Sequence, residues 1–278
     1  MRIDAHQHFW KYEPREYGWI DESMRALRRD FLPRDLEPLL KANGFDGCVA
    51  VQARQSLEET LWLLELAKQF PFIRGVVGWV DLRAEDLQAT LATLSKNRKL
   101  VGVRHIVQSE PDDQFLLRPD FLRGIGMLEE FALAYDILIY TKHLRVAAKF
   151  VSKFPRQKFV LDHLAKPPIK SGKLDEWERG IREIAKFPNG MAKVSGLATE
   201  ADWTTWRPEQ IRACLDVALE CFGAQRLMIG SDWPVCTVAG TYERVVGLAM
   251  EYLRERCSAE EAEAVLGGNA ARFYGLQG

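Results

Sequence analysis

Eight short apolar runs recur along the chain and alternate with segments of helical periodicity. The runs are rich in β-branched residues and apolar at successive positions, which is typical of strands that are covered on both faces. Several of the segments between them begin with a helix-start signal, such as Ser56 followed by Glu58 and Glu59. The predicted strands are residues 2–6, 46–52, 73–80, 100–107, 136–141, 158–163, 190–196 and 226–232.

Eight strand–helix units in 278 residues predict an α/β fold of the (β/α)8 TIM barrel type. A doubly wound open sheet is the competing architecture, but it favours a glycine-rich phosphate turn, and no GxGxxG follows an early strand. No low-complexity linker divides the sequence, so we expect residues 1–278 to form a single domain. Residues 9–31 and 108–118 are expected to be long loops.

Charge and composition narrow the classes of partner. The net charge is −1 and the 38 lysines and arginines are scattered, which argues against a nucleic-acid or anionic-membrane partner. No membrane-length apolar stretch occurs and no export signal follows Met1, so we expect a cytoplasmic protein. The five cysteines form no CxxC cluster, which argues against a disulfide framework or a thiolate zinc site. We therefore expect a small-molecule partner and a monomer or a homodimer.

All the histidines fall at or just beyond the carboxyl end of a predicted strand; they are His6, His8, His105, His143 and His163. In a (β/α)8 barrel this end carries the chemistry, because the loops that follow the strands meet there. A lone histidine at a strand end is more often structural than functional. The clustering of five at one rim predicts a functional site.

Side-chain alternation predicts which of these residues meet. Successive side chains of a strand point to opposite faces, so Asp4, His6 and His8 are expected to share one face. The same parity groups Phe159, Leu161 and His163 in the sixth strand, and Met228, Gly230 and Asp232 in the eighth. His6, His8, His163 and Asp232 are therefore predicted to converge, and this set suits one divalent metal, most naturally zinc.

Aromatic and polar side chains at the same rim predict a sugar-like ligand, because ring faces stack on C–H groups while polar groups bind hydroxyls. Trp79, Trp203 and Trp206 lie at or beyond predicted strand ends, and Trp19 lies in the long loop after the first strand. The predicted substrate contacts are Trp10, Gln52, Arg104, His105, Tyr140, Lys166 and Trp233.

Five motifs together resemble one known family; they are DAHQHFW, VGVRH, LDHLAKPP, GSDWPV and GNAARFYGL. They are similar to the lactonase branch of the amidohydrolase superfamily, whose members open sugar-acid lactones. The resemblance covers essentially the whole chain and implies a barrel with a site formed by His6, His8, His163 and Asp232. Members of the branch include hydrolases that work without bound metal, so the resemblance does not make zinc a requirement. Arg104 stands where binuclear relatives have a metal-bridging lysine, which argues against a two-metal site.

The predicted reaction is the opening of an aldono-1,4- or aldono-1,5-lactone by water. Asp232 is the expected general base, and His163 is expected to orient the carbonyl or to pass a proton to the leaving alkoxide. Arg104 is expected to stabilise the oxyanion. A bound metal would lower the pKa of the attacking water.

Three alternatives stay open. A metal-dependent decarboxylase of an unsaturated or aromatic acid has a similar HxH start, but the tryptophan-rich rim argues against it. A hydrolase of a non-sugar lactone, such as a muconolactone or a pyrone, would use the same groups. A non-catalytic sugar-binding protein would explain the tryptophans but has no need of a carboxylate beside clustered imidazoles. Release of acid or of CO2, from lactones or carboxylated aromatics, distinguishes these functions.

Overall fold

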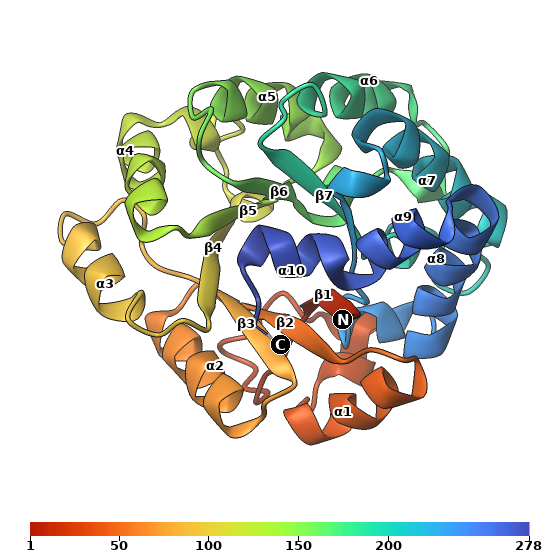
Figure 1. The fold of residues 1–278 in the computed structure, drawn as a ribbon, viewed down its shortest axis with the longest axis horizontal. Helices are drawn as coiled ribbons and strands as arrows, with labels where there is room; N and C mark the ends of the chain where they lie inside the picture. The colour runs from red at the N-terminus through yellow and green to blue at the C-terminus, as the bar shows by residue number, and fades with distance from the viewer. Residues whose placement is uncertain (278) are drawn as a thin grey trace.

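The computed structural model describes residues 1–277 and contains eight parallel strands in one sheet, paired in chain order. The strands are β1 (Ile3–Gln7), β2 (Gly47–Val51), β3 (Ile73–Gly78), β4 (Leu100–Ile106), β5 (Ala134–Leu138), β6 (Phe159–Leu161), β7 (Gly190–Val194) and β8 (Leu227–Ile229). Helices surround the sheet (Figure 1); they are α1 (Pro33–Ala42), α2 (Leu57–Gln69), α3 (Leu87–Leu94), α4 (Pro119–Leu128), α5 (Leu144–Ser152), α6 (Asp175–Ile184), α7 (Pro208–Phe222) and α8 (Tyr242–Arg256). The predicted (β/α)8 barrel is confirmed.

Local sequence explains where several of the outer helices begin. Pro33, Pro119 and Pro208 open α1, α4 and α7, where a missing N–H leaves no hydrogen bond unmade and the fixed φ suits the first turn. Ser56 and Thr241 cap α2 and α8, because each hydroxyl accepts a hydrogen bond from the amide three residues further on.

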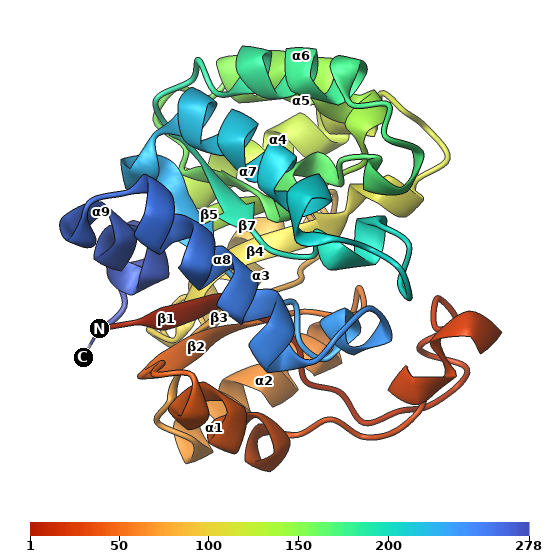
Figure 2. The same ribbon diagram turned by 90° about the vertical axis from the view of Figure 1, so that its right-hand side faces the viewer.

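The interior of the barrel is apolar at the end opposite the histidines. Side chains such as Val49, Val77 and Met228 fill it, and Phe273 and Tyr274 of α10 (Asn269–Tyr274) join the same cluster. Figure 2 shows both termini and α9 (Ala259–Glu263) at one end of the molecule, with the segment between β1 and α1 at the other. The polar residues of the site therefore lie toward the other end of the barrel from this apolar cluster.

Two backbone hydrogen bonds join β1 to the segment after β8 and close the sheet. The amide of His8 donates to the carbonyl of Trp233 at 2.7 Å, and the amide of Asp232 donates to the carbonyl of His6 at 2.8 Å. Closure thus brings the two ends of the sequence together at the rim that carries the histidines.

The long segment after β1 folds back on the barrel instead of forming an open loop. Trp10 and Phe31 exchange backbone hydrogen bonds of 3.0 and 2.9 Å, and the Trp10 ring packs against Tyr17, Trp19 and Phe31. A 3-10 helix, η1 (Glu22–Leu27), lies between them. Within residues 1–277, no helix has both the length and the apolar character needed to cross a bilayer.

Candidate active site

A β-bulge in β1 aims two imidazoles into the barrel. The pairing of β1 with β2 shifts register between Asp4 and Gln7, so that the alternation of faces is interrupted there. Asp4 points outward and accepts a 3.0 Å hydrogen bond from the Tyr242 hydroxyl of α8. His6 and His8 both point inward. The prediction that Asp4 shares their face was wrong, because simple alternation does not account for the extra residue.

His163 reaches the same place by a different route. Phe159 and Leu161 of β6 pack outward under the helices, whereas Val160 lies inside the barrel. The predicted face of Phe159, Leu161 and His163 was therefore wrong. The chain leaves the strand in a left-handed conformation, with φ of 53° at His163 and 54° at Lys166, and this turn brings the His163 imidazole inward.

Two glycines leave the space that the converging side chains occupy. Gly196 has a φ of +63°, and a Cβ there would lie 2.6 Å from His163 Nδ1 and 3.1 Å from Asp232 Oδ2. A Cβ on Gly230 would lie 2.6 Å from the Cβ of His6. Both positions therefore need glycine for the site to form.

Three electron-pair donors converge between β1 and the end of β8. His6 Nε2 and His8 Nε2 are 3.3 Å apart, and Asp232 Oδ1 lies 3.3 Å from His8 Nε2 and 3.8 Å from His6 Nε2. His8 Nδ1 donates to the carbonyl of Val51 at 2.7 Å, so that its Nε2 is left with a lone pair. His6 Nε2 likewise faces a donor, Arg104 Nη1, at 3.2 Å.

This donor set fits a divalent cation. His6, His8 and Asp232 are all buried and offer ligand atoms within 4.8 Å of one another. Two imidazole nitrogens and a carboxylate oxygen are ligands that zinc accepts, and the Val51 carbonyl supplies the outer hydrogen bond that orients a metal-binding histidine. His163 stands beside this set, with its Nε2 3.9 Å from Asp232 Oδ1.

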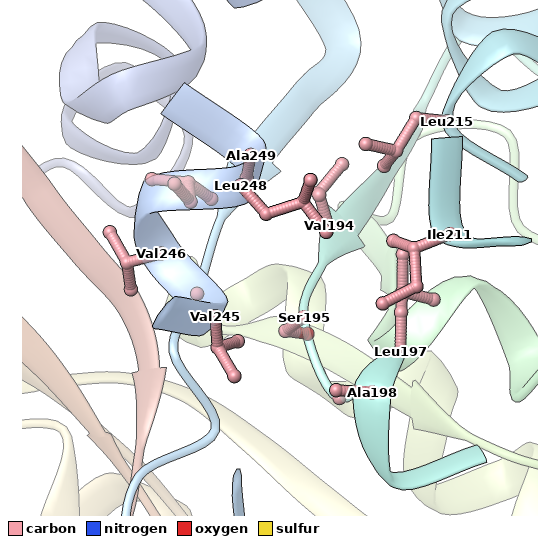
Figure 3. A pocket seen from close by; sticks show the side chains of 13 residues that line it. Val194, Ser195, Leu197, Ala198, Ile211, Leu215, Val245, Val246, Leu248 and Ala249 are labelled. Atoms are coloured by element: carbon pink, nitrogen blue, oxygen red, sulfur yellow. The ribbon is translucent and has the colours of Figure 1, made fainter. Parts of the chain in front are cut away.

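Ser195 orients His163. Its hydroxyl oxygen lies 2.9 Å from His163 Nδ1. Figure 3 shows Ser195 directly after the end of β7, beside a narrow apolar cavity between β7 and the helices α7 and α8. Within residues 1–277 the Ser195 hydroxyl has no other hydrogen-bond partner, and the imidazole also packs against the His6 ring at 4.4 Å.

Arg104 is fully engaged by the protein. Its guanidinium donates to the carbonyl and the side-chain oxygen of Gln52, to Asp162 Oδ2 at 3.0 Å and toward His6 Nε2. It therefore acts on the pocket through its positive charge and by holding its neighbours in place.

Sequence reasoning missed a charged layer beneath the site. Lys193 of β7 lies 3.1 Å from Asp162 Oδ1 and forms an ion pair with Asp136 of β5, and all three side chains are fully buried. Tyr274 of α10 donates to Asp136 at 2.9 Å. The signal was present, because a lysine within the apolar run GMAKVSG has to find a buried carboxylate.

The cluster shifts the pKa values of its members. Burial lowers the pKa of His163 to about 4 and that of His6 well below its ordinary value, since the charged imidazolium would lose its water. Burial alone would raise the pKa of Asp232, but the neighbouring imidazoles, that of His163 first, hold it below the ordinary value. At neutral pH, Asp232 is therefore ionised, while His6 and His163 are neutral.

A pocket of about 380 Å³ opens beside this cluster. Three of the predicted substrate contacts line it, Arg104, Tyr140 and Lys166, together with the rim tryptophan Trp203 and the loop residue Trp19. Its wall also contains residues that sequence reasoning did not single out, among them Met24, Gln108, Thr199, Glu200, Val235 and Val238.

The other four predicted contacts lie outside the pocket lining. Trp10 and Trp233 both pack against Phe31, and Gln52 serves as the acceptor for Arg104. His105 faces outward, stacked on Phe115 at 4.8 Å, with its Nε2 2.6 Å from Glu110.

Comparisons with known proteins agree with this geometry. A family model described as amidohydrolase matches residues 3–276. The chain is 42% identical to an L-fucono-1,5-lactonase of Burkholderia multivorans, over 99% of this chain and 96% of that protein. It is 39% identical to an L-fucono-1,5-lactonase of Burkholderia ambifaria, over 99% of this chain and 95% of that protein. A crystal structure of a Burkholderia multivorans amidohydrolase with bound zinc superposes with a TM-score of 0.97, at 42% identity and with complete coverage of both chains. The chain therefore belongs to the amidohydrolase family.

Proposed function

We propose that this protein is a lactonase that opens a sugar-acid lactone by attack of water on the ester carbonyl. One observation carries the substrate class: the chain is similar along nearly its whole length to two L-fucono-1,5-lactonases. L-Fucono-1,5-lactone is therefore the first substrate to test. The names of these relatives agree with the lactone hydrolysis inferred from the sequence motifs and not with the decarboxylase alternative.

Asp232 is the proposed general base. Its carboxylate is ionised at neutral pH, lies beside His6 and His8, and lines the pocket where a lactone would bind. It takes a proton from water as the oxygen attacks the carbonyl carbon. The C–O bond of the ring then breaks, the proton returns to the leaving alkoxide, and the product is a hydroxy acid.

His163 and Arg104 act on the carbonyl oxygen in different ways. We assign the Ser195 hydroxyl as the donor to His163 Nδ1, 2.9 Å away, because this tautomer gives His163 an Nε2–H that can hydrogen-bond to the oxyanion as it forms. The donors of Arg104 are already engaged, so its positive charge stabilises the oxyanion through space and through its hold on His6.

Of the four predicted ligands, His6, His8 and Asp232 are the residues that would hold a zinc ion, and His163 lies beside them. The ion would lower the pKa of a bound water toward about 7 and polarise the ester carbonyl. We propose that one zinc binds here. Arg104 supplies a positive charge at the same place, so an assay after chelation is needed to decide whether turnover depends on the ion.

The decisive test is a panel of aldonolactones assayed by acid release, before and after chelation, with metal content measured on the same sample. We expect hydrolysis of L-fucono-1,5-lactone with kcat/KM on the order of 10⁴ M⁻¹ s⁻¹ or more. The Asp232→Asn protein, prepared identically, controls for spontaneous opening and contaminants. Acid release no faster than in that control, for every lactone tested, would overturn the proposal.

We also propose that the enzyme works in the cytoplasm, as a monomer or a homodimer. Light scattering on the purified protein measures the number of chains per particle. A mass above that of two chains would contradict the proposed monomer or homodimer.

A further inference from the structure

We infer that Glu200 makes the pocket selective for uncharged lactones by neutralising Lys166. Both side chains line the pocket, and Lys166 Nζ lies 3.5 Å from Glu200 Oε1. The inference rests on the proposed lactone hydrolysis and extends it, because it assigns a role to a carboxylate that takes no part in the chemistry above.

Lys166 is fixed in the pocket wall by its backbone. Its left-handed conformation follows directly from the turn that places His163, and its amide donates to the His163 carbonyl at 2.8 Å. The Thr141 hydroxyl donates to the Lys166 carbonyl at 3.1 Å, and the ammonium lies 5.4 Å from the centre of the Tyr140 ring. The charge is therefore held at the wall, and its side chain is only 19% exposed.

Each cation that lines the pocket has a carboxylate partner. Arg104 is paired with Asp162 at 3.0 Å, outside the pocket lining. Within residues 1–277, Glu200 is the one carboxylate that lies within 4.0 Å of the Lys166 ammonium. Burial raises the pKa of Glu200 and Lys166 opposes that rise, so the pair is electrostatically coupled in a partly desolvated place.

The proposed reaction makes this pairing consequential. A neutral lactone enters and an aldonate, which carries a negative charge, has to leave. With Lys166 neutralised by Glu200, this ammonium adds no net attraction for the departing aldonate. A lactone that bears its own carboxylate is disfavoured for the same reason.

Glu200→Gln keeps the shape of the side chain and removes its charge. We expect L-fuconate, the ring-opened product of L-fucono-1,5-lactone, to bind this variant on the order of tenfold more tightly than wild type, by calorimetry. The gain should shrink as salt is raised, because it is an ionic attraction. The kcat/KM for muconolactone, which bears a carboxylate, should rise relative to that for the neutral lactone.

Two further variants isolate the cause. Lys166→Met combined with Glu200→Gln should return L-fuconate affinity to the wild-type level, because the unpaired ammonium is gone. Asp202→Asn is the matched control, since Asp202 lies at the same 3.5 Å from Lys170 but does not line the pocket. We expect it to leave L-fuconate affinity unchanged.

The outcomes separate this inference from the proposed function. L-Fuconate affinity in folded Glu200→Gln that is no higher than in wild type would overturn the role of Glu200 while leaving lactone hydrolysis intact. Equal tightening in Asp202→Asn would also overturn it, because the effect would then be one of overall charge. Failure of the wild-type enzyme to hydrolyse any lactone would overturn the proposed function instead. The L-fuconate affinities can still be measured by calorimetry in that case, because binding needs no turnover.

Discussion

The amide of Asp232 donates a 2.8 Å hydrogen bond to the carbonyl of His6, so the proposed base and the first imidazole are joined through the backbone. The same closure connects His8 to Trp233. A strand at each end of the sequence therefore contributes to one rigid site, and displacement of either would separate the base from the imidazoles.

Gly196→Ala should lower kcat by more than a loss of folding stability alone would explain. The new methyl would meet His163 Nδ1 at 2.6 Å, and the backbone φ of +63° disfavours any side chain. Because a displacement of about 1 Å can cost on the order of 100-fold in rate, we expect kcat to fall by about that factor.

Gly172→Ala is the matched control for this prediction. Gly172 has a φ of +68°, but nothing lies within 4 Å of the position of its Cβ. We expect a loss of about 1 kcal/mol in unfolding free energy from the backbone and unchanged kcat. Equal kcat in the two alanine variants would refute the steric explanation.

Lys193→Met should destabilise the protein by about 3–5 kcal/mol, because it leaves the fully buried Asp136 with only the Tyr274 hydroxyl and removes one of the two cations paired with Asp162. Urea unfolding measures the change. The double variant Lys193→Met with Asp136→Asn should lose less than the single variant, since one of the buried charges is also gone. A double variant as unstable as the sum of both changes would contradict this explanation.

The buried carboxylate of Glu59 should make the free energy of unfolding depend on pH. Its carboxylate is 2% exposed and accepts from the amides of Ala53 and Arg54, and burial raises its pKa to about 7 from 4.5. The folded state thus binds the proton more tightly than the unfolded state, and its stability falls as pH rises from about 4.5 to about 7. The loss attributable to this group is roughly 3 kcal/mol.

Glu59→Gln removes that titration while keeping the side-chain shape. Urea unfolding of the two proteins at pH 5 and pH 8 measures the effect, and the variant should gain relative to wild type at the higher pH. A difference between the two proteins that is the same at both pH values would show that Glu59 does not titrate as described.

The fold could be predicted because its signal is repeated eight times along the chain. Each strand and helix can be recognised from its own short stretch of sequence, and eight such units in a row favour the same architecture. The predicted ends of β6 and β8 were too long by a few residues, because the left-handed turns at His163 and Asp232 leave no mark in an apolar pattern.

Which residues form the site could be predicted more reliably than the face of the strand on which each of them lies. His6, His8 and Asp232 do converge, with His163 beside them. The bulge after Asp4 depends on pairing with β2, which single-strand alternation does not contain. Arg104 and His105 are neighbours in one strand, so alternation already implied that only one of them could face the pocket.

For the tryptophans, the predicted set of substrate contacts was itself partly wrong. Trp10 and Trp233 were expected to contact the substrate, but both pack on Phe31, which lies 21 residues after Trp10 in the sequence. That contact depends on how the segment 9–31 folds. Trp203 and Trp19 do line the pocket.

The turnover of Asp232→Asn tests the central claim most directly. The asparagine keeps the shape and burial of the side chain but has no basic oxygen, so kcat for L-fucono-1,5-lactone should fall by about 10²–10⁴-fold in a protein that remains folded. Turnover within a few-fold of wild type, in a sample shown to be folded, would contradict the assignment of Asp232 as the base.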